Sequence, residues 1–411
     1  MLLALLAAAG CSSMAETGMH AFERQDYAQA MDCWLPLAER GEASAQFLVG
    51  LLHDEGRGVA EDDAQAAHWY RLAAEQGHAA AQNNLGLLCY QGHGVSHSHE
   101  EAARWFDRAA AQGHAPARTN LGVMALHGHA MPKDPSRARD HLAAAAEHGD
   151  RQAQRTLAAL CEAGIGGPVD ARAAAHWLRL AAEGGDADAQ LQLGQAYLRG
   201  HGVEQNAVAA RTWLQRSAEQ GVAQAQATLG WLYRQGLGVN RDPRMAATWY
   251  GRAAEQGLPV AQTELGRMLM NGEGLAKDET RAVEWFTTAA GAGFNLAQFE
   301  LGLAHLRGQG VAASADQALR WLRLAAEGGL AVAQTSLGRL HETGRGVEPD
   351  PVTAFMWYRL ASANGDVEAQ TRLDCVAREL SETQRGQAEQ LTAAWRALHA
   401  GDEPALAAPG R

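Results

Sequence analysis

The chain has 411 residues, of which 47% are hydrophobic and 20% are charged, and its 47 acidic and 35 basic residues give a formal net charge of −12. This acidic balance argues against nucleic acid as a partner, because binding phosphates needs concentrated positive charge. No stretch is long and apolar enough to span a bilayer, and the five cysteines include no C-x-x-C pair, so the sequence indicates no disulfide framework.

The chain begins with a short apolar run, residues 1–10, which ends in small residues just before Cys11-Ser12-Ser13. This arrangement resembles the signal peptide and lipobox of a bacterial lipoprotein, in which the run is removed and Cys11 is acylated. The resemblance implies an outer-membrane lipoprotein that faces the periplasm, because Ser12 is not the aspartate typical of inner-membrane retention. The alternative is an Ala/Leu-rich first helix that stays on the mature protein.

Residues 11–41 follow as an N-terminal capping segment. Gln25 to Ala30, with Trp34 and Leu37, predict a pair of helices over about 14–40 that resembles the opening of a tetratricopeptide array. An open stack of repeats needs such a cap, since its end would otherwise expose an apolar face.

Residues 42–365 hold nine copies of a 36-residue unit with no insertion or deletion between them. Glycine recurs at this spacing at Gly41, Gly77, Gly113, Gly149, Gly185, Gly221, Gly257, Gly293, Gly329 and Gly365. A fixed period of this length indicates stacked helical units rather than a globular enzyme core. Corresponding positions of the copies form a column, named here by its residue in the first copy.

Each copy predicts two helices. Ala45, Leu48, Val49, Leu52 and His53 share one face of the first, called helix A. The glycine of column 56 then ends helix A, because it adopts the left-handed conformation without a steric penalty.

The second helix, called helix B, begins after a residue able to cap it. Column 62 reads Asp62, Ser98, Asp134, Asp170, Asn206, Asp242, Asp278, Ser314 and Asp350, and each of these side chains can accept a hydrogen bond from the first turn. Pro135, Pro243 and Pro351 follow their caps directly, where the missing N–H has no cost. Each copy is therefore predicted to be a helix–turn–helix unit.

Tryptophan dominates column 69 and is predicted to fill the space between helices. The column reads Trp69, Trp105, Trp177, Trp213, Trp249, Trp285, Trp321 and Trp357, with His141 as the exception. Truncating one of them to alanine is expected to cost about 3–5 kcal/mol. Glycine in column 50 is predicted to let the helices approach closely.

The recurring residues resemble the Sel1-like repeat, a branch of the tetratricopeptide superfamily. In the second copy the signature appears as Ala81-Gln82-x-x-Leu85-Gly86, then Gly92-x-Gly94-Val95, and later Ala102-x-x-Trp105-Phe106. The resemblance covers about residues 42–380. It implies an all-α fold, a right-handed α-solenoid whose A helices line a concave face, and a role in holding other proteins together.

Copies three and four depart most from the pattern. Ala130 replaces the second turn glycine, His141 the tryptophan, and Ala158 the glycine of helix A. We expect looser or differently angled packing over residues 122–170.

The far end is predicted to be a helical cap over residues 366–400. Ser381 and Gln384 fit a capping box, and Ala388, Leu391 and Trp395 indicate the apolar face of the last helix. Residues 401–411 are predicted to be a disordered tail.

No motif for catalysis is found: the sequence has no Walker loop, no G-x-S-x-G and no H-E-x-x-H. We therefore expect no enzyme activity and no cofactor. The nearest candidate for chemistry is a group of turn histidines, His93, His97, His99, His127 and His129, which could bind a transition metal at the surface. Variable polar loop residues are the favoured interpretation, so no metal is predicted.

The partner-binding face is placed by analogy with the superfamily on the columns of Phe47, Leu51, Asp54 and Glu55. The candidate residues are Tyr90, Arg199, Trp231, Arg234, Arg267, Phe299, Arg307 and Arg339. The five arginines could form a positive stripe that suits an acidic peptide or an anionic glycan. The alternative is that they are solvated or ion-paired within the stack.

Together these observations favour a non-catalytic scaffold for protein–protein interaction in the bacterial cell envelope, anchored to the membrane through Cys11. Two alternatives stay open: a secreted effector that binds host proteins, and a hydrolase acting on cell-wall material or β-lactams.

Overall fold

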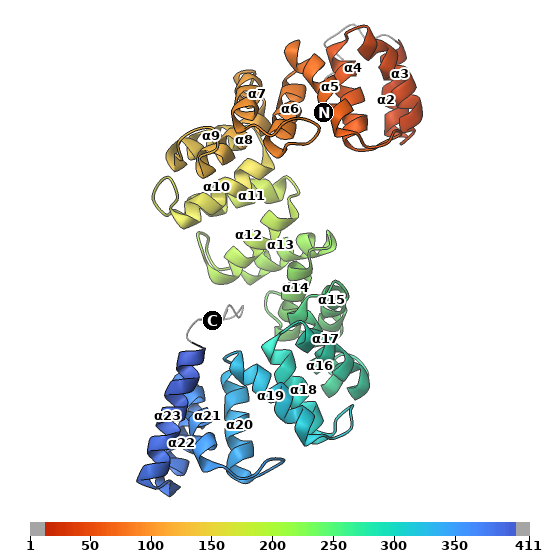
Figure 1. Ribbon diagram of the computed structural model, residues 1–411. Helices are drawn as coiled ribbons and strands as arrows, with labels where there is room; N and C mark the ends of the chain where they lie inside the picture. The colour runs from red at the N-terminus through yellow and green to blue at the C-terminus, as the bar shows by residue number, and fades with distance from the viewer. Residues whose placement is uncertain (1–12, 400–411) are drawn as a thin grey trace. The chain divides into compact units, whose positions relative to one another are not determined.

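The structure is a computed structural model that describes residues 13–399, in which 22 α-helices and no strands are found (Figure 1). The prediction of an all-α protein built from helix–turn–helix units is confirmed. Cys11, the apolar run 1–10 and the predicted tail 401–411 lie outside the described residues. Within 13–399, no helix combines the length and the apolar character that crossing a membrane requires.

The chain divides into two compact units, Met1–Asn206 and Ala207–Arg411. The described helices of the first unit are α2 (Ser13–Glu23), α3 (Tyr27–Glu39), α4 (Ala43–Asp54), α5 (Asp63–Glu75), α6 (Ala79–Gln91), α7 (His99–Ala111), α8 (Ala115–His127), α9 (Pro135–Glu147), α10 (Arg151–Ala163), α11 (Ala171–Glu183) and α12 (Ala187–Arg199). Those of the second unit are α13 (Ala207–Glu219), α14 (Ala223–Gln235), α15 (Pro243–Glu255), α16 (Pro259–Asn271), α17 (Glu279–Gly291), α18 (Asn295–Arg307), α19 (Ala315–Glu327), α20 (Ala331–Thr343), α21 (Pro351–Ala363), α22 (Val367–Glu379) and α23 (Glu382–Leu398).

The helix boundaries follow from capping chemistry. Side chains of column 62 accept hydrogen bonds from first-turn N–H groups, as predicted, for example Asp62, Ser98 and Asp134. The glycines that end helix A are left-handed, for example Gly92 with φ +79°. These local signals repeat at one spacing, so the helices from α5 to α22 all have the same length.

The centre of the core is formed by column 70, the position after column 69, and the tryptophans lie around it. Column 70 reads Tyr70, Phe106, Leu142, Leu178, Leu214, Tyr250, Phe286, Leu322 and Tyr358, and none of these residues is more than 3% exposed. The tryptophans are fully buried only at Trp105, Trp249 and Trp357, and are half-buried at Trp69, Trp177, Trp213, Trp285 and Trp321.

The indoles lie at the edge of the core for a physical reason. Successive helix residues point about 100° apart, so only one of two neighbouring aromatic residues can face the centre. The other is covered partly by a cation: the guanidinium carbon of Arg252 lies 4.5 Å from the Trp249 ring centroid, and that of Arg216 lies 4.7 Å from the Trp213 ring. The indole is large and amphipathic, which suits this position.

Close approach of helices A and B through column 50 is confirmed. A β-carbon added at Gly266 would lie 2.5 Å from Cε1 of Phe286, and one at Gly338 would lie 2.6 Å from Cε1 of Tyr358. The missing side chain therefore makes room for the central residue of column 70. In the fourth copy Ala158 takes the place of this glycine and is itself buried.

Buried glutamines join every repeat except the third, which has Arg118 at this position, to the unit before it, a contact that the sequence did not reveal. The Gln82 amide donates to the Ala74 carbonyl oxygen (3.0 Å), and the Gln112 amide donates to Gln82 Oε1 (2.8 Å). The same bond to the residue eight positions earlier is made by Gln46, Gln154, Gln190, Gln226, Gln262, Gln298 and Gln334. A side-chain amide thus satisfies a carbonyl at the end of the preceding helix B.

Helices occupy both ends of the described residues, α2 and α3 at one end and α22 and α23 at the other. The capping box of Ser381 and Gln384 is present. Leu391, predicted on the apolar face of α23, is 42% exposed, whereas Ala388 and Thr392 are buried. The apolar face of α23 therefore runs through residues 388, 392 and 395. The ring of Trp395 contacts that of Trp357, with 6.0 Å between the ring centroids.

Candidate functional site

The candidate binding residues lie mainly on the A helices of the second unit. Trp231 and Arg234 belong to α14, Arg267 to α16, Phe299 and Arg307 to α18, and Arg339 to α20. We call the side of α14, α16, α18 and α20 that carries these residues the helix-A face. Tyr90 at the end of α6 and Arg199 at the end of α12 lie in the first unit.

An ion-pair ladder connects three successive A helices on the helix-A face. Arg234 contacts Glu264 (2.6 Å) and Glu273 (2.8 Å). Arg267 contacts Glu300 (2.6 Å) and Glu264 (3.2 Å). Since these five side chains are each about one-third exposed or less, the network fixes long side chains in defined positions more firmly than isolated surface pairs would.

The carboxylate of Glu273 in the ladder stays charged at neutral pH. Burial raises the pKa of Glu273, but hydrogen bonds and charge from Arg234 and Arg241 outweigh it and hold the pKa below the usual value.

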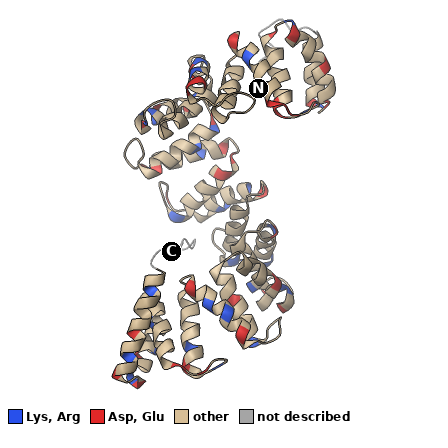
Figure 2. Cartoon of the chain, in the orientation of Figure 1, with Lys and Arg blue, Asp and Glu red and all other residues tan. Residues whose placement is uncertain are grey.

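The arginines therefore do not form an uncompensated positive stripe. Arg339 is paired as well, with Glu368, so three of the five arginines are ion-paired within the stack, the alternative that the sequence left open. Arg199 and Arg307 are exposed at the last residue of their helices. Figure 2 shows basic and acidic residues interspersed along the helices of each unit rather than gathered by sign.

Two aromatic side chains accompany the ladder. Trp231 lies one turn before Arg234 on α14 and Phe299 directly precedes Glu300 on α18, and both are only partly buried. Each rests with one side on the core while leaving surface accessible. Aromatic residues held in this way are the side chains most often used as anchors in protein interfaces.

Tyr90 has a different environment from the other candidates. Its hydroxyl lies 2.8 Å from Nδ1 of His129, and its ring lies 4.9 Å from that of His99. The structure thus assigns Tyr90 to a histidine cluster of the first unit rather than to the helix-A face.

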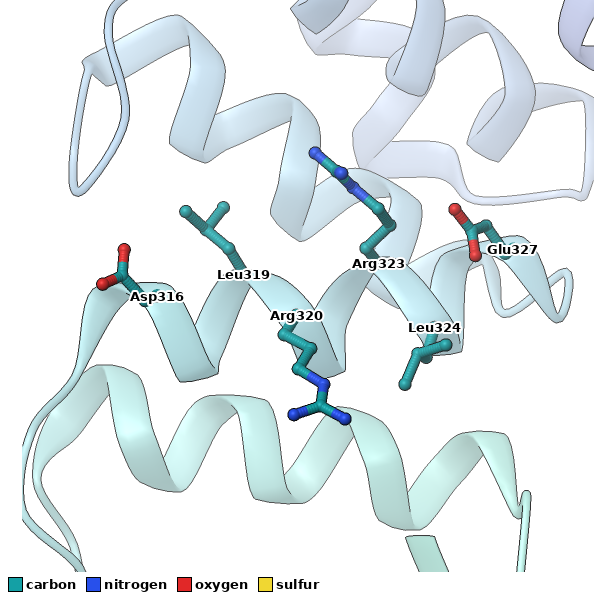
Figure 3. Close-up of a pocket in the computed structure, with 6 residues that line it drawn as sticks. All are labelled: Asp316, Leu319, Arg320, Arg323, Leu324 and Glu327. Carbon is teal, nitrogen blue, oxygen red and sulfur yellow. The ribbon is translucent and has the colours of Figure 1, made fainter. Parts of the chain in front are cut away.

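A shallow hollow of about 440 Å³ lies on α19 (Figure 3). It is lined by Asp316, Leu319, Arg320, Arg323, Leu324 and Glu327. All six belong to one helix, and in Figure 3 Leu319 and Arg323 point to one side of it while Arg320 and Leu324 point to the other. Side chains that diverge in this way do not form a convergent catalytic group.

Among residues 13–399, no three His, Cys, Asp or Glu side chains are arranged to hold a metal ion. The four described cysteines, Cys33, Cys89, Cys161 and Cys375, are free thiols. Burial raises the pKa of Cys89 to about 11, so this thiol is protonated and unreactive at neutral pH.

Sequence reasoning missed the acidic half of the ladder. Glu264 and Glu300 belong to column 48, which was not among the four columns predicted to form the partner-binding face. A signal was present in the spacing: Arg234 and Glu264 are 30 residues apart, and Arg267 and Glu300 are 33 apart. A repeat of 36 residues brings such positions of neighbouring helices together.

Comparison with known proteins places these features in context. The family model described as Sel1 repeat matches nine consecutive segments, 43–78, 79–114, 115–150, 151–186, 187–222, 223–258, 259–294, 295–330 and 331–366. The chain is similar to the crystal structure of a protective antigen present in uropathogenic Escherichia coli strains, described as having an SLR fold. The two are 33% identical over 96% of this chain and 94% of the other, with a TM-score of 0.58.

A second similar structure is a Sel1 repeat protein from Oxalobacter formigenes. It is 32% identical over 78% of this chain and 93% of the other, with a TM-score of 0.56. Among curated proteins none matches this chain.

Proposed function

Because the chain belongs to the Sel1 repeat family, we propose that it is a non-catalytic scaffold of the bacterial cell envelope that binds partner proteins on the helix-A face of its second unit. Members of this family are generally scaffolds for protein–protein interaction. One observation carries the proposal. Two partly exposed aromatic side chains, Trp231 on α14 and Phe299 on α18, lie on helices that the ion-pair ladder connects. Rigid aromatic anchors beside ordered charges form a pre-organised binding surface.

The charge balance of this face favours a protein over a purely anionic partner. Glu264, Glu273 and Glu300 neutralise Arg234 and Arg267, so an anionic glycan would gain little from them. A polypeptide can place apolar side chains against the aromatic residues and polar groups against both signs of charge.

The proposed location in the cell envelope is based on the resemblance of the N-terminal residues to a lipoprotein signal peptide, with Cys11 as the acylated residue. A secreted effector is the alternative. The mass of the mature N-terminus separates the two, since acylation at Cys11 predicts a lipid-modified cysteine and secretion predicts an unmodified chain in the medium.

The proposal is tested by removing the two anchors together. The double variant Trp231→Ala/Phe299→Ala is expected to reduce capture of proteins from native membranes by at least about thirtyfold, because central aromatic anchors typically contribute about 2 kcal/mol or more. Quantitative mass spectrometry of the captured proteins measures the change.

Two controls distinguish binding from folding. Leu324→Ala changes a 38% exposed side chain of α19, outside the helix-A face, and should leave capture unchanged. The exchange Arg267→Glu/Glu300→Arg keeps an ion pair between α16 and α18 but reverses its direction, and should weaken capture without loss of helix content. Equal capture by the double variant and the wild-type protein would rule out this face.

A further inference from the structure

Four histidines of the first unit gather where two successive turns meet. His97 and His99 come from the turn between α6 and α7 and the first residue of α7, and His127 and His129 come from the end of α8 and the turn that follows. The His99 and His129 rings are stacked, with centroids 4.3 Å apart and planes at 6°. His97 lies 4.6 Å from His99, and His127 lies 5.5 Å from His129.

Most other repeats make a contact through bare backbone at the corresponding turn. In most copies the second turn glycine touches the start of the preceding helix B: a β-carbon added at Gly94 would lie 2.2 Å from the carbonyl carbon of Asp63, and one at Gly166 would lie 2.2 Å from the carbonyl oxygen of Pro135. The third copy has Ala130 at this position, with φ +58°. A β-carbon therefore stands at the position where most copies have none, directly after His129 in the chain.

The arrangement is not that of a preformed metal site. Rings stacked face to face place their nitrogen atoms side by side rather than toward one point, and no group of three metal ligands is found among the described residues. Their closeness matters instead for charge, since histidine is the side chain whose protonation changes between pH 5 and 8.

The groups that face His129 are mainly other histidines. Tyr90 from α6 is hydrogen-bonded to its Nδ1, His97 and His99 approach from the preceding turn and α7, and His127 is the neighbour on α8. Burial, followed by the charges of His99, His127 and His97, lowers the pKa of His129.

One carboxylate and two basic side chains other than histidine lie near the cluster in the sequence. Glu100, which is fully exposed, follows His99 on α7, with Arg104 one turn further on, and Lys133 belongs to the same turn as His129. Since solvent screens Glu100, this carboxylate offsets little of the repulsion among four protonated rings.

We propose that the cluster of His97, His99, His127 and His129 is a proton-sensitive latch between the second and third repeats. With neutral rings, the stack of His99 on His129 holds the turn after α8 against α7. When two of the rings become charged, imidazolium ions about 4 Å apart repel one another, and the turn 128–134 separates from α7. Acid therefore loosens one defined junction of the array.

The sign of the pH effect follows from the direction of the shift. The pKa of His129 is lower in the folded protein than in the unfolded chain, where it is near 6.5. At a given pH in this range the folded state therefore binds fewer protons than the unfolded chain. The contribution of His129 to stability is complete above pH 6.5 and is lost as the pH falls through the lower, folded-state pKa.

Hydrogen exchange of the full chain at pH 7.5 and pH 5.5 tests the latch. After correction for the intrinsic pH dependence of exchange, amides of residues 128–134 should lose protection at least about fivefold at the lower pH, the factor that corresponds to repulsion between two unit charges 4 Å apart in water. The variant His99→Gln/His129→Gln should show less than a twofold pH response. The matched control His93→Gln, which alters the same turn outside the cluster, should respond as the wild-type protein does.

Protection of α21 serves as a check that each variant is folded. In addition, imidazole NMR signals should report a titration midpoint for His129 below that of the free residue. An equal pH response in the wild-type protein and the double histidine variant, or no response in the wild-type protein, would overturn the proposal.

Discussion

Replacing Phe286 by alanine is expected to lower the free energy of unfolding by about 3–5 kcal/mol. The side chain is 1% exposed and fills the space left by Gly266 on the facing helix. Its removal leaves a cavity between α16 and α17 that neighbouring backbone cannot close, because the helices already lie as near as the glycine permits. Urea unfolding followed by circular dichroism measures the loss.

The adjacent tryptophan provides a matched comparison. Trp285 is larger but only partly buried, so Trp285→Ala should cost less than half as much as Phe286→Ala. The contrast decides which column forms the centre of the core. Equal losses, or a larger loss for the tryptophan, would contradict the order of burial described above and restore the interpretation favoured by the sequence.

Replacing Gly266 by leucine is the second change with a large expected effect, a loss of about 3 kcal/mol or more. A β-carbon there would lie 2.5 Å from Cε1 of Phe286 and 3.2 Å from the carbonyl oxygen of Ala282. Helix B must then move away from helix A, which also disturbs the contacts of α17 with its other neighbours. Leucine is a good helix former, so the loss cannot be attributed to helix propensity.

The control for this variant is the same substitution at another helical glycine. Gly251 on α15 has no heavy atom within 4 Å of where a β-carbon would stand. Gly251→Leu should be neutral or raise the free energy of unfolding by up to about 1 kcal/mol, since only the gain in helix propensity remains. If both variants lose the same stability, close approach at Gly266 is not the cause.

Much of this fold could be predicted from the sequence, because its determinants are local and repeated. Asp134 caps α9 and Gly92 ends α6 through hydrogen bonds and backbone conformations that involve a few neighbouring residues. Their identity alone therefore locates the helix ends. Because the period is fixed, the same caps and turn glycines recur in every copy. One assignment of the helix ends therefore applies to the whole array.

The contacts between repeats were harder to predict, because they depend on how each helix pair is rotated against the next. The pairing of Arg234 with Glu264 requires this rotation, and a period of 36 residues does not specify it. The choice between Trp285 and Phe286 for the centre of the core depends on a rotation of similar size. Leu391 was placed wrongly for the same reason, since Thr392 one position further on is buried instead.

The binding role of the helix-A face is the central claim, and the location of a bound partner tests it most directly. Hydrogen exchange of the full chain should be measured with and without a partner captured from native membranes. The account predicts new protection on α14, α16 and α18, with the strongest effect near Trp231 and Phe299, and no change on α15, α17 and α19. Protection confined to those B helices, or spread evenly over both sets, would contradict it.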